Sequence, residues 1–261
     1  MQMNHIRRGT GKPLLLIHGL GGSWHSWSTI LDALAREREV IVVDLPGFGE
    51  TPALPGEVSI STLAEAVTSF LKDQNLTGVD VVGSSMGARL VLELARRGVV
   101  GATVSLDPGG FWRGWERPFF STSVALSVRL VRLLQPVMPF LTSNPITRSL
   151  LFAQFSAHPW ALPADVTLTE MRTFAASPSF DPLLHQLVAG PAQQGVAVGA
   201  LSRPLVIGWG RHDKVCLPQQ AQRAMQLFPD ARLHWFETSG HFPQWDAPQE
   251  TTRLILDTTK G

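Results

Sequence analysis

The chain has 261 residues, of which 44% are hydrophobic and 16% are charged. This composition excludes an intrinsically disordered chain, and the length suits one large α/β domain. Lys and Arg number 22 against 21 Asp and Glu, and they form no basic stripe or acidic tail, so charge predicts neither a nucleic-acid partner nor a membrane partner.

The beginning of the chain and its cysteine content bear on the compartment. The first apolar run, residues 14–17, is too short for the core of a signal peptide and has no cleavage site after it. Cys216 is the single cysteine, which excludes an internal disulfide and a cysteine-based zinc cluster. We therefore expect a cytoplasmic protein without a bound metal.

Short apolar runs alternate with helical patterns in the first part of the chain, which is typical of a parallel sheet with crossover helices. Each run is apolar throughout, as expected when helices cover both faces of the sheet. Strands are predicted at residues 14–18, 40–44, 79–83 and 103–107, and helices at 24–36, 60–75 and 86–97.

This alternation stops after Asp107. About ninety residues rich in Pro, Trp, Phe and Ser follow without a strand pattern. We predict that residues 108–201 form a mainly helical insertion, and that residues 1–107 and 202–261 together form the α/β core.

Within the insertion, residues 124–134 have a helical pattern that is apolar apart from Arg129 and Arg132. These two charges argue against a membrane span, so we predict a lid helix. The alternation then resumes, with strands predicted at 205–209 and 233–236 and helices at 219–227 and 248–257.

The strongest motif is Gly83-Ser84-Ser85-Met86-Gly87, a G-x-S-x-G sequence directly after a predicted strand and directly before a predicted helix. A serine on so sharp a turn is held in a strained backbone, and glycines two residues away on either side relieve the crowding. Its hydroxyl then projects from the sheet edge, where the start of a helix favours developing negative charge. Ser85 is therefore predicted to be a nucleophile; the alternative is an N-capping serine in a glycine-rich helix start.

A serine nucleophile needs a base, and the base needs an acid that orients it. His241, in the loop after the last predicted strand, is the candidate base, since that loop lies at the carboxyl edge of the sheet. Asp213, after the preceding strand, is the candidate acid and gives the chain order serine, acid, histidine. Asp107 is the competing acid, whereas Asp44 ends a strand in a Pro-Gly turn and is interpreted as structural.

An acyl-transfer site also needs two donors for the oxyanion of the tetrahedral intermediate. The backbone N–H of Met86, the residue after the nucleophile, is predicted to be one of them. The glycines of His18-Gly19-Leu20-Gly21-Gly22 let the main chain approach a substrate, and the N–H of Leu20 is predicted to be the other.

These segments, together with 44–49 and Gly240-His241, resemble the α/β-hydrolase superfamily over the front half of the chain and about its last sixty residues. The resemblance implies an α/β fold with a doubly wound, mostly parallel sheet, a helical cap inserted after Asp107, and a cofactor-free enzyme with Ser85, Asp213 and His241 in the triad positions. Few residues precede the first central strand, which puts an edge strand in doubt. Epoxide hydrolases of this fold use an Asp nucleophile and cap tyrosines, so the serine at the elbow and the absence of Tyr disfavour that activity. Haloalkane dehalogenases also use Asp as the nucleophile, so the same serine disfavours them.

Large apolar side chains of the insertion and beside the base are candidates for the wall of a substrate pocket. They are Trp112, Phe119, Phe120, Met138, Phe155 and Phe242. The alternative is that most of them pack the insertion onto the sheet. Cys216 has no base motif beside it and is interpreted as a small buried residue.

The motifs predict a carboxylic ester hydrolase that forms an acyl-enzyme on Ser85 and acts on small to medium apolar esters without a cofactor. Hydrolysis of a carbon–carbon bond in ring-cleavage products stays open, because Ser85-Met86-Gly87 and residues 241–245 resemble segments of such enzymes. Lactone opening and peracid formation would use the same acyl-enzyme. A hydrolase-fold receptor for a small ligand is the alternative from another class. The expected partner is a small-molecule ester, and the sequence does not predict the oligomeric state.

Overall fold

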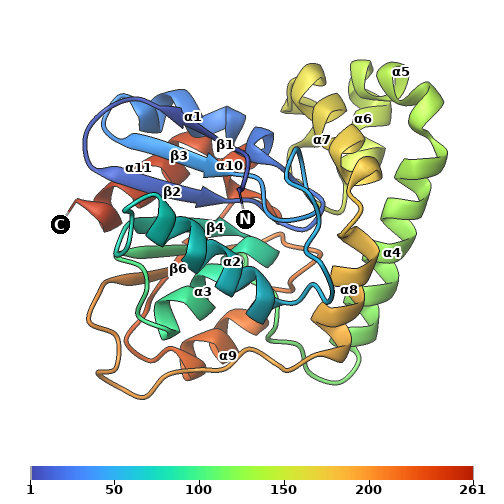
Figure 1. Cartoon of the computed structure of the whole chain (residues 1–261). Helices are drawn as coiled ribbons and strands as arrows, with labels where there is room; N and C mark the ends of the chain where they lie inside the picture. The colour runs from blue at the N-terminus through green and yellow to red at the C-terminus, as the bar shows by residue number, and fades with distance from the viewer. Residues whose placement is uncertain (1, 261) are drawn as a thin grey trace.

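The computed structural model describes residues 2–260, in which seven strands form one central sheet with the order β1-β3-β2-β4-β5-β6-β7 (Figure 1). The edge strand β1 runs antiparallel to β3, and all other neighbours are parallel. The predicted mostly parallel sheet is therefore confirmed. The strands are β1 (His5–Arg8), β2 (Pro13–Ile17), β3 (Glu39–Val43), β4 (Asp80–Ser84), β5 (Thr103–Leu106), β6 (Leu205–Gly210) and β7 (Arg232–Phe236).

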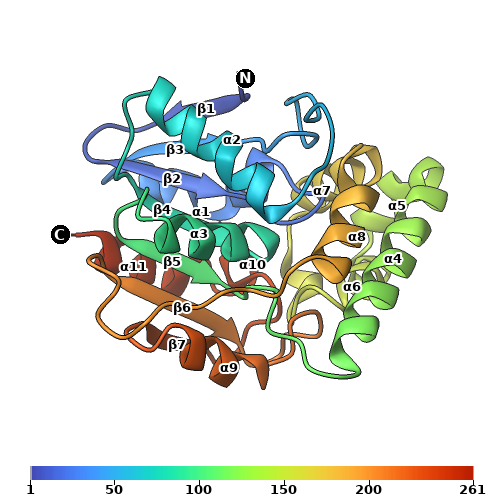
Figure 2. The same cartoon turned by 60° about the horizontal axis from the view of Figure 1, so that its bottom comes forward.

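Helices cover both faces of this sheet, because successive strand residues point to opposite sides and both sides are apolar. Leu15 and Val81 face the side that α2, α3 and α9 cover, whereas Leu14 and Val82 face the side of α1 and α11 (Figure 2). The helices of the core are α1 (Ser28–Ala35), α2 (Ile60–Asp73), α3 (Met86–Arg96), α9 (Gln220–Leu227), α10 (Pro243–Asp246) and α11 (Pro248–Thr259), with the short 3-10 helix η1 (Trp24–Trp27) before α1.

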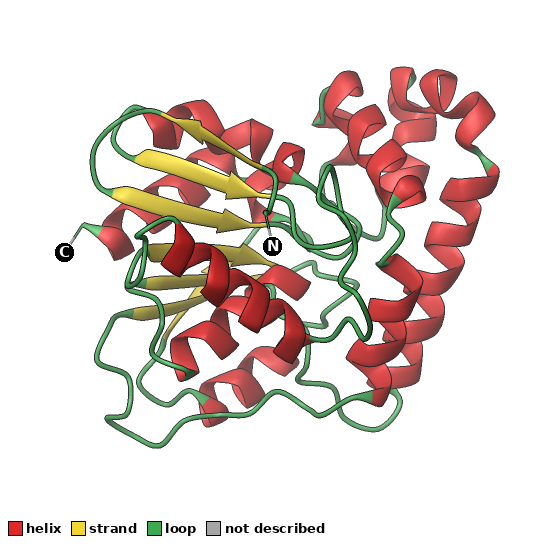
Figure 3. Ribbon diagram, in the orientation of Figure 1, coloured by secondary structure: helices red, strands yellow, loops and turns green. Residues whose placement is uncertain are grey.

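The segment between β5 and β6 is mainly helical from Glu116 to Ala189. It lies beyond the carboxyl ends of the strands, where the arrows point in Figure 3. Its α helices are α4 (Glu116–Leu133), α5 (Met138–Ser143), α6 (Pro145–Phe152), α7 (Ala164–Ala176) and α8 (Phe180–Ala189), with the 3-10 turns η2 (Gln135–Val137) and η3 (Pro159–Ala161). No single helix among residues 2–260 is both long and apolar enough to cross a membrane; α4 and the η2–α5 segment reach that composition only together, across a bend of 62°.

Several elements differ from the sequence prediction. The predicted helix 24–36 is divided into η1 and α1, and α10 was not predicted. The strand β1 was not predicted because its residues are polar, and it needs only one partner because it lies at the sheet edge. One strand, β1, therefore precedes the first central strand β2 and forms the edge of the sheet that the sequence left in doubt. The helix α4 begins at Glu116, eight residues before the predicted 124, because Pro118 is tolerated in a first helical turn.

Candidate active site

Ser85 lies at the sharp turn between β4 and α3, in the backbone conformation that the motif predicts. Its φ is 57° and its ψ is −115°, a strained combination for a residue with a side chain. A Cβ on Gly83 would lie 2.2 Å from the carbonyl oxygen of Gly87, and a Cβ on Gly87 would lie 2.3 Å from that of His18. Both glycines are therefore required by close backbone packing.

The structure brings Ser85, His241 and Asp213 together. The Ser85 hydroxyl lies 2.7 Å from Nε2 of His241, and Nδ1 of the same ring lies 2.8 Å from Oδ2 of Asp213. His241 and Asp213 are both buried, at 1% and 3% exposure, so water does not compete for this chain of hydrogen bonds. The geometry allows the imidazole to accept the serine proton while its other nitrogen donates to the carboxylate.

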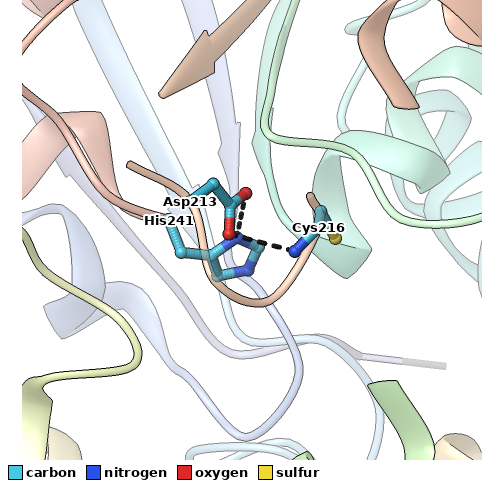
Figure 4. A group of neighbouring side chains, drawn as sticks. All are labelled: Asp213, Cys216 and His241. Atoms are coloured by element: carbon cyan, nitrogen blue, oxygen red, sulfur yellow. Dashed lines mark hydrogen bonds and ion pairs between the residues drawn. The ribbon is translucent and has the colours of Figure 1, made fainter. Parts of the chain in front are cut away.

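The Asp213 carboxylate is held by the loop that follows β6. Its Oδ1 accepts hydrogen bonds from the backbone N–H groups of Val215, at 2.7 Å, and Cys216, at 3.0 Å. Figure 4 shows the carboxylate between the His241 ring and the Cys216 backbone. Two donors on one oxygen and the imidazole on the other fix the orientation of the acid.

Asp107, the competing acid, makes no hydrogen bond with His241. It has a φ of 51°, and its Oδ1 accepts a 2.8 Å hydrogen bond from the backbone N–H of Gly210. Burial and the nearby Asp213 carboxylate raise the pKa of Asp107 well above its usual range. The raised pKa favours the protonated form of Asp107, and it is Asp213 that contacts the base.

The loop that carries His241 is held by the insertion, which the sequence motifs did not indicate. The backbone N–H of His241 donates to the carbonyl of Phe155 at 2.9 Å. Asp246, in α10, accepts from the N–H of Gly240 at 2.7 Å, from the N–H of Ala157 at 2.8 Å and from the hydroxyl of Ser156. Asp246 is thus a positioning residue, and its only sequence signal is a polar side chain in the segment after the base.

The candidate oxyanion donors lie beside Ser85. Met86 is the first residue of α3, where backbone N–H groups have no intrahelical acceptor. A Cβ on Gly19 would lie 3.7 Å from the Ser85 hydroxyl oxygen, so the loop that contains Leu20 passes close to the nucleophile. Leu20 also lines the cavity described below.

His18 fixes this loop in a defined orientation. Its Nε2 accepts from the N–H of Leu45 at 3.0 Å, so the proton of the neutral ring is on Nδ1, which donates to the carbonyl of Gly19 at 2.7 Å. Complete burial lowers the pKa of His18 and keeps it neutral. Asp44 accepts three hydrogen bonds, from Asn4, from the Trp24 N–H and from the Glu50 N–H, in agreement with its structural interpretation.

An apolar cavity between the sheet edge and the insertion opens onto Ser85 and His241. Four of the predicted pocket residues line it: Trp112, Phe120, Phe155 and Phe242. Most of the rest of its lining comes from α4, α7, α8 and the β6–α9 loop, namely Val124, Ser127, Val128, Val131, Phe174, Phe180, Leu187, Val215 and Cys216. The remaining lining residues are Leu20, Met86, Arg89 and Gly109.

Two predicted pocket residues do not line this cavity. Phe119 is 41% exposed and packs edge-to-face on Trp115, because neighbouring residues of a helix point about 100° apart and Phe120 takes the inward position. Met138 is fully buried in the apolar core of the insertion at the start of α5. Both are corrections to the sequence prediction.

Cys216 is buried, as predicted, and lies close to the acid and the base. One ligand atom from each of Asp213, Cys216 and His241 lies within 4.8 Å of the others (Figure 4), a spacing that could hold a metal ion. However, Asp213 and His241 are already hydrogen-bonded to one another, and burial raises the pKa of the Cys216 thiol well above its usual range. The Asp213–His241 hydrogen bond thus occupies two of the three candidate ligands.

Two further ionisable side chains are buried, one in α3 and one in α7. Arg89, in α3, lines the cavity and donates to the carbonyls of Leu187 and Pro191, at 3.4 and 2.6 Å, and burial lowers its pKa to about 10. Glu170, in α7, accepts a 3.0 Å hydrogen bond from Ser26 of η1, and burial raises its pKa to about 8. Arg89 therefore stays charged at neutral pH, whereas Glu170 is neutral.

The seven-stranded sheet and the arrangement of Ser85, His241 and Asp213 at its carboxyl edge are those of a hydrolase built on an α/β fold. The chain belongs to the alpha/beta hydrolase family, whose model matches residues 14–254. Membership of this family supports hydrolase activity.

Known proteins resemble the chain over almost all its length. The 2-hydroxy-6-oxo-2,4-heptadienoate hydrolase of Pseudomonas putida is 28% identical, over 95% of this chain and 89% of that protein. A thermophilic esterase from Thermogutta terrifontis superposes with a TM-score of 0.77 at 19% identity, over 99% of this chain and 93% of the esterase. A meta-cleavage product hydrolase from Pseudomonas fluorescens superposes with a TM-score of 0.73 at 19% identity, over 99% of this chain and 94% of that hydrolase. These superpositions show the shared α/β-hydrolase fold.

Proposed function

We propose that the protein is a carboxylic ester hydrolase that forms an acyl-enzyme on Ser85 and acts on small to medium apolar esters. The observation that carries the proposal is the unbroken chain of hydrogen bonds from Ser85 through His241 to Asp213 at the mouth of an apolar cavity. A polarised serine beside a cavity of this kind suits acyl transfer from a neutral, apolar acyl group.

In the first half of the reaction, the Ser85 oxygen forms a bond to the ester carbonyl carbon while Nε2 of His241 takes the hydroxyl proton. Asp213 stabilises the imidazolium that results, and the N–H groups of Leu20 and Met86 are the proposed donors to the oxyanion. When the carbon–oxygen bond of the ester breaks, His241 returns its proton to the departing alcohol. The acyl group is then attached to Ser85.

In the second half, a water molecule gives its proton to His241 and its oxygen attacks the acyl carbon. The bond to Ser85 breaks, the serine oxygen regains the proton, and the carboxylic acid leaves. Each oxyanion donor is expected to lower the activation free energy by about 3 to 4 kcal/mol. The orienting carboxylate is expected to lower it by a comparable amount or more.

Hydrolysis of a carbon–carbon bond is the second candidate, and two observations favour keeping it. A relative with 28% identity is named as a 2-hydroxy-6-oxo-2,4-heptadienoate hydrolase, and such a substrate carries a carboxylate that needs a cation. Arg89 is the cavity residue with a permanent charge. Its terminal nitrogens donate to the carbonyls of Leu187 and Pro191. Its Nε is buried without a hydrogen-bond partner, so this N–H remains available to a carboxylate in the cavity.

The test compares para-nitrophenyl butyrate with 2-hydroxy-6-oxo-2,4-heptadienoate as substrates for the wild type and for the Ser85→Ala and Asp213→Asn variants. We expect many turnovers on the butyrate, loss of at least about 10⁴-fold in Ser85→Ala, and a loss of about 10⁴-fold in kcat in Asp213→Asn. A fluorophosphonate probe is expected to label Ser85, with the site located by mass spectrometry.

Several outcomes would contradict the proposal. A higher kcat/KM for the dienoate than for any ester would favour the carbon–carbon hydrolase. A single slow burst without turnover would favour a receptor that retains a reactive serine. A lactone or a perhydrolysis assay that exceeds ester hydrolysis would keep the acyl-enzyme but change the substrate class. The matched control is Ser61→Ala, an exposed serine of α2, which should not alter turnover.

A further inference from the structure

The helix α4 is apolar on two sides. Phe120, Val124, Val128 and Val131 are buried and line the cavity, facing α7 and α8. Its other side is exposed to solvent, and in Figures 1 and 2 α4 lies with α5 at the edge of the molecule away from the sheet. A helix on the surface of a globular protein normally has a polar solvent-facing side. The apolar solvent-facing side of α4 therefore indicates a role other than packing.

The exposed stripe of α4 consists of Phe119, Leu126, Leu130 and Leu133, which we name the outer apolar face. Their exposed fractions are 41%, 66%, 49% and 75%, and spacings of seven, four and three residues keep them on one side of the helix. All but one of the strongly exposed large hydrophobic side chains among residues 2–260 lie between residues 115 and 160. Exposed apolar side chains gathered in one segment indicate an interaction surface.

The charges of the same segment are one-sided. No Asp or Glu stands between Arg117 and Ala164, whereas this stretch contains four Arg, of which Arg117 and Arg129 are exposed. The near-neutral total charge of the chain hides this local excess of positive charge. An anionic surface would be attracted to it, whereas a second copy placed symmetrically on the face would bring like charges together.

We propose that the outer apolar face of α4 docks on a lipid surface that carries anionic headgroups. The four apolar side chains enter the interface, and Arg117 and Arg129 contact the headgroups, as in other helices that lie in the plane of a membrane surface. Because the same helix forms a wall of the cavity, docking places the cavity one helix diameter, about 10 Å, from a phase in which apolar esters concentrate. Docking itself does not depend on ester hydrolysis.

The experiment measures co-sedimentation with vesicles of phosphatidylglycerol and phosphatidylcholine in equal parts, and with vesicles of phosphatidylcholine alone, using the full chain at low salt. The wild type and Ser85→Ala are expected to bind the anionic vesicles equally and to be released by high salt. Leu126→Gln/Leu130→Gln/Leu133→Gln is expected to lower the partition coefficient at least about tenfold. Val198→Gln, which removes the exposed apolar side chain outside residues 115–160, is the matched control and should bind as the wild type does.

A second variant, Arg117→Gln/Arg129→Gln, separates charge from apolar contact and keeps the proposal testable if the triple variant does not fold. It is expected to lose about tenfold in binding to the anionic vesicles and little in binding to phosphatidylcholine alone. The proposal is overturned if the wild type stays in the supernatant, or if both variants bind as well as Val198→Gln. It is also overturned if light scattering shows a wild-type dimer that the triple variant converts to a monomer, because the face would then hold a second copy.

Discussion

The protonation of Glu170 yields a prediction that is independent of activity. Glu170 is 1% exposed, lies in the insertion and accepts a hydrogen bond from Ser26 of the core. Its pKa is raised from 4.5 to about 8 by burial, so folding favours the protonated carboxyl. A group whose pKa is raised in the folded state stabilises the fold fully below its unfolded pKa, and this contribution is lost as the pH rises towards the folded pKa.

The magnitude follows from the two pKa values. Each pH unit between them lowers the free energy of unfolding by about 1.4 kcal/mol, so a rise from about pH 5 to about pH 7.5 costs about 3 kcal/mol. The Glu170→Gln variant keeps an acceptor for Ser26 and has no proton to lose. Its stability relative to the wild type is therefore expected to increase by about 3 kcal/mol over that pH range.

Urea unfolding at the two pH values measures this difference, with the midpoint and slope determined for each protein. Glu65→Gln is the matched control, because Glu65 is an exposed carboxylate of α2, and its effect should be within about 0.5 kcal/mol at both pH values. If the stability difference between Glu170→Gln and the wild type is the same at both pH values, Glu170 is ionised in the fold and the argument from burial is wrong.

Three further changes test the site and its surroundings. Asp107→Asn keeps a neutral group beside Asp213, so the acidic half-point of the kcat/KM profile should move by less than about 0.3 pH unit; a fall of a full unit would mean that Asp107 is ionised. Asp44→Ala leaves three donors without their acceptor and should lower the free energy of unfolding by at least about 3 kcal/mol in urea titrations. Val128→Phe narrows the cavity, so kcat/KM for octanoate esters should fall at least about tenfold while acetate hydrolysis changes little; equal losses would place the acyl group elsewhere.

The core and the convergence of the candidate site could be predicted because their signals are local. Most strands of the core are short apolar runs, and Ser85, Asp213 and His241 each follow a predicted strand. In a parallel sheet the carboxyl ends of the strands meet at one edge, so residues far apart in the chain are brought together there. The glycines at 83 and 87 also have a local cause, since both allow backbones to approach one another.

What could not be predicted depends on tertiary contacts. The sequence favours Asp213 as the acid by chain order but leaves Asp107 open, and the packing of the β6–α9 loop decides which one reaches His241. Phe119 and Phe120 are neighbours of the same residue type, and the direction of α4 decides which one enters the cavity. Helix direction and loop packing are properties of the assembled molecule, so an apolar composition could not separate these roles.

The insertion does more than supply a wall of the cavity, because its backbone holds the base. The carbonyl of Phe155 and the N–H of Ala157 belong to the insertion, and they contact the N–H of His241 and the carboxylate of Asp246. A Cβ on Gly240 would lie 2.9 Å from the nitrogen of Ala157, so this contact is close along its whole length. A displacement of the insertion would therefore move the imidazole relative to Ser85 as well as opening the cavity.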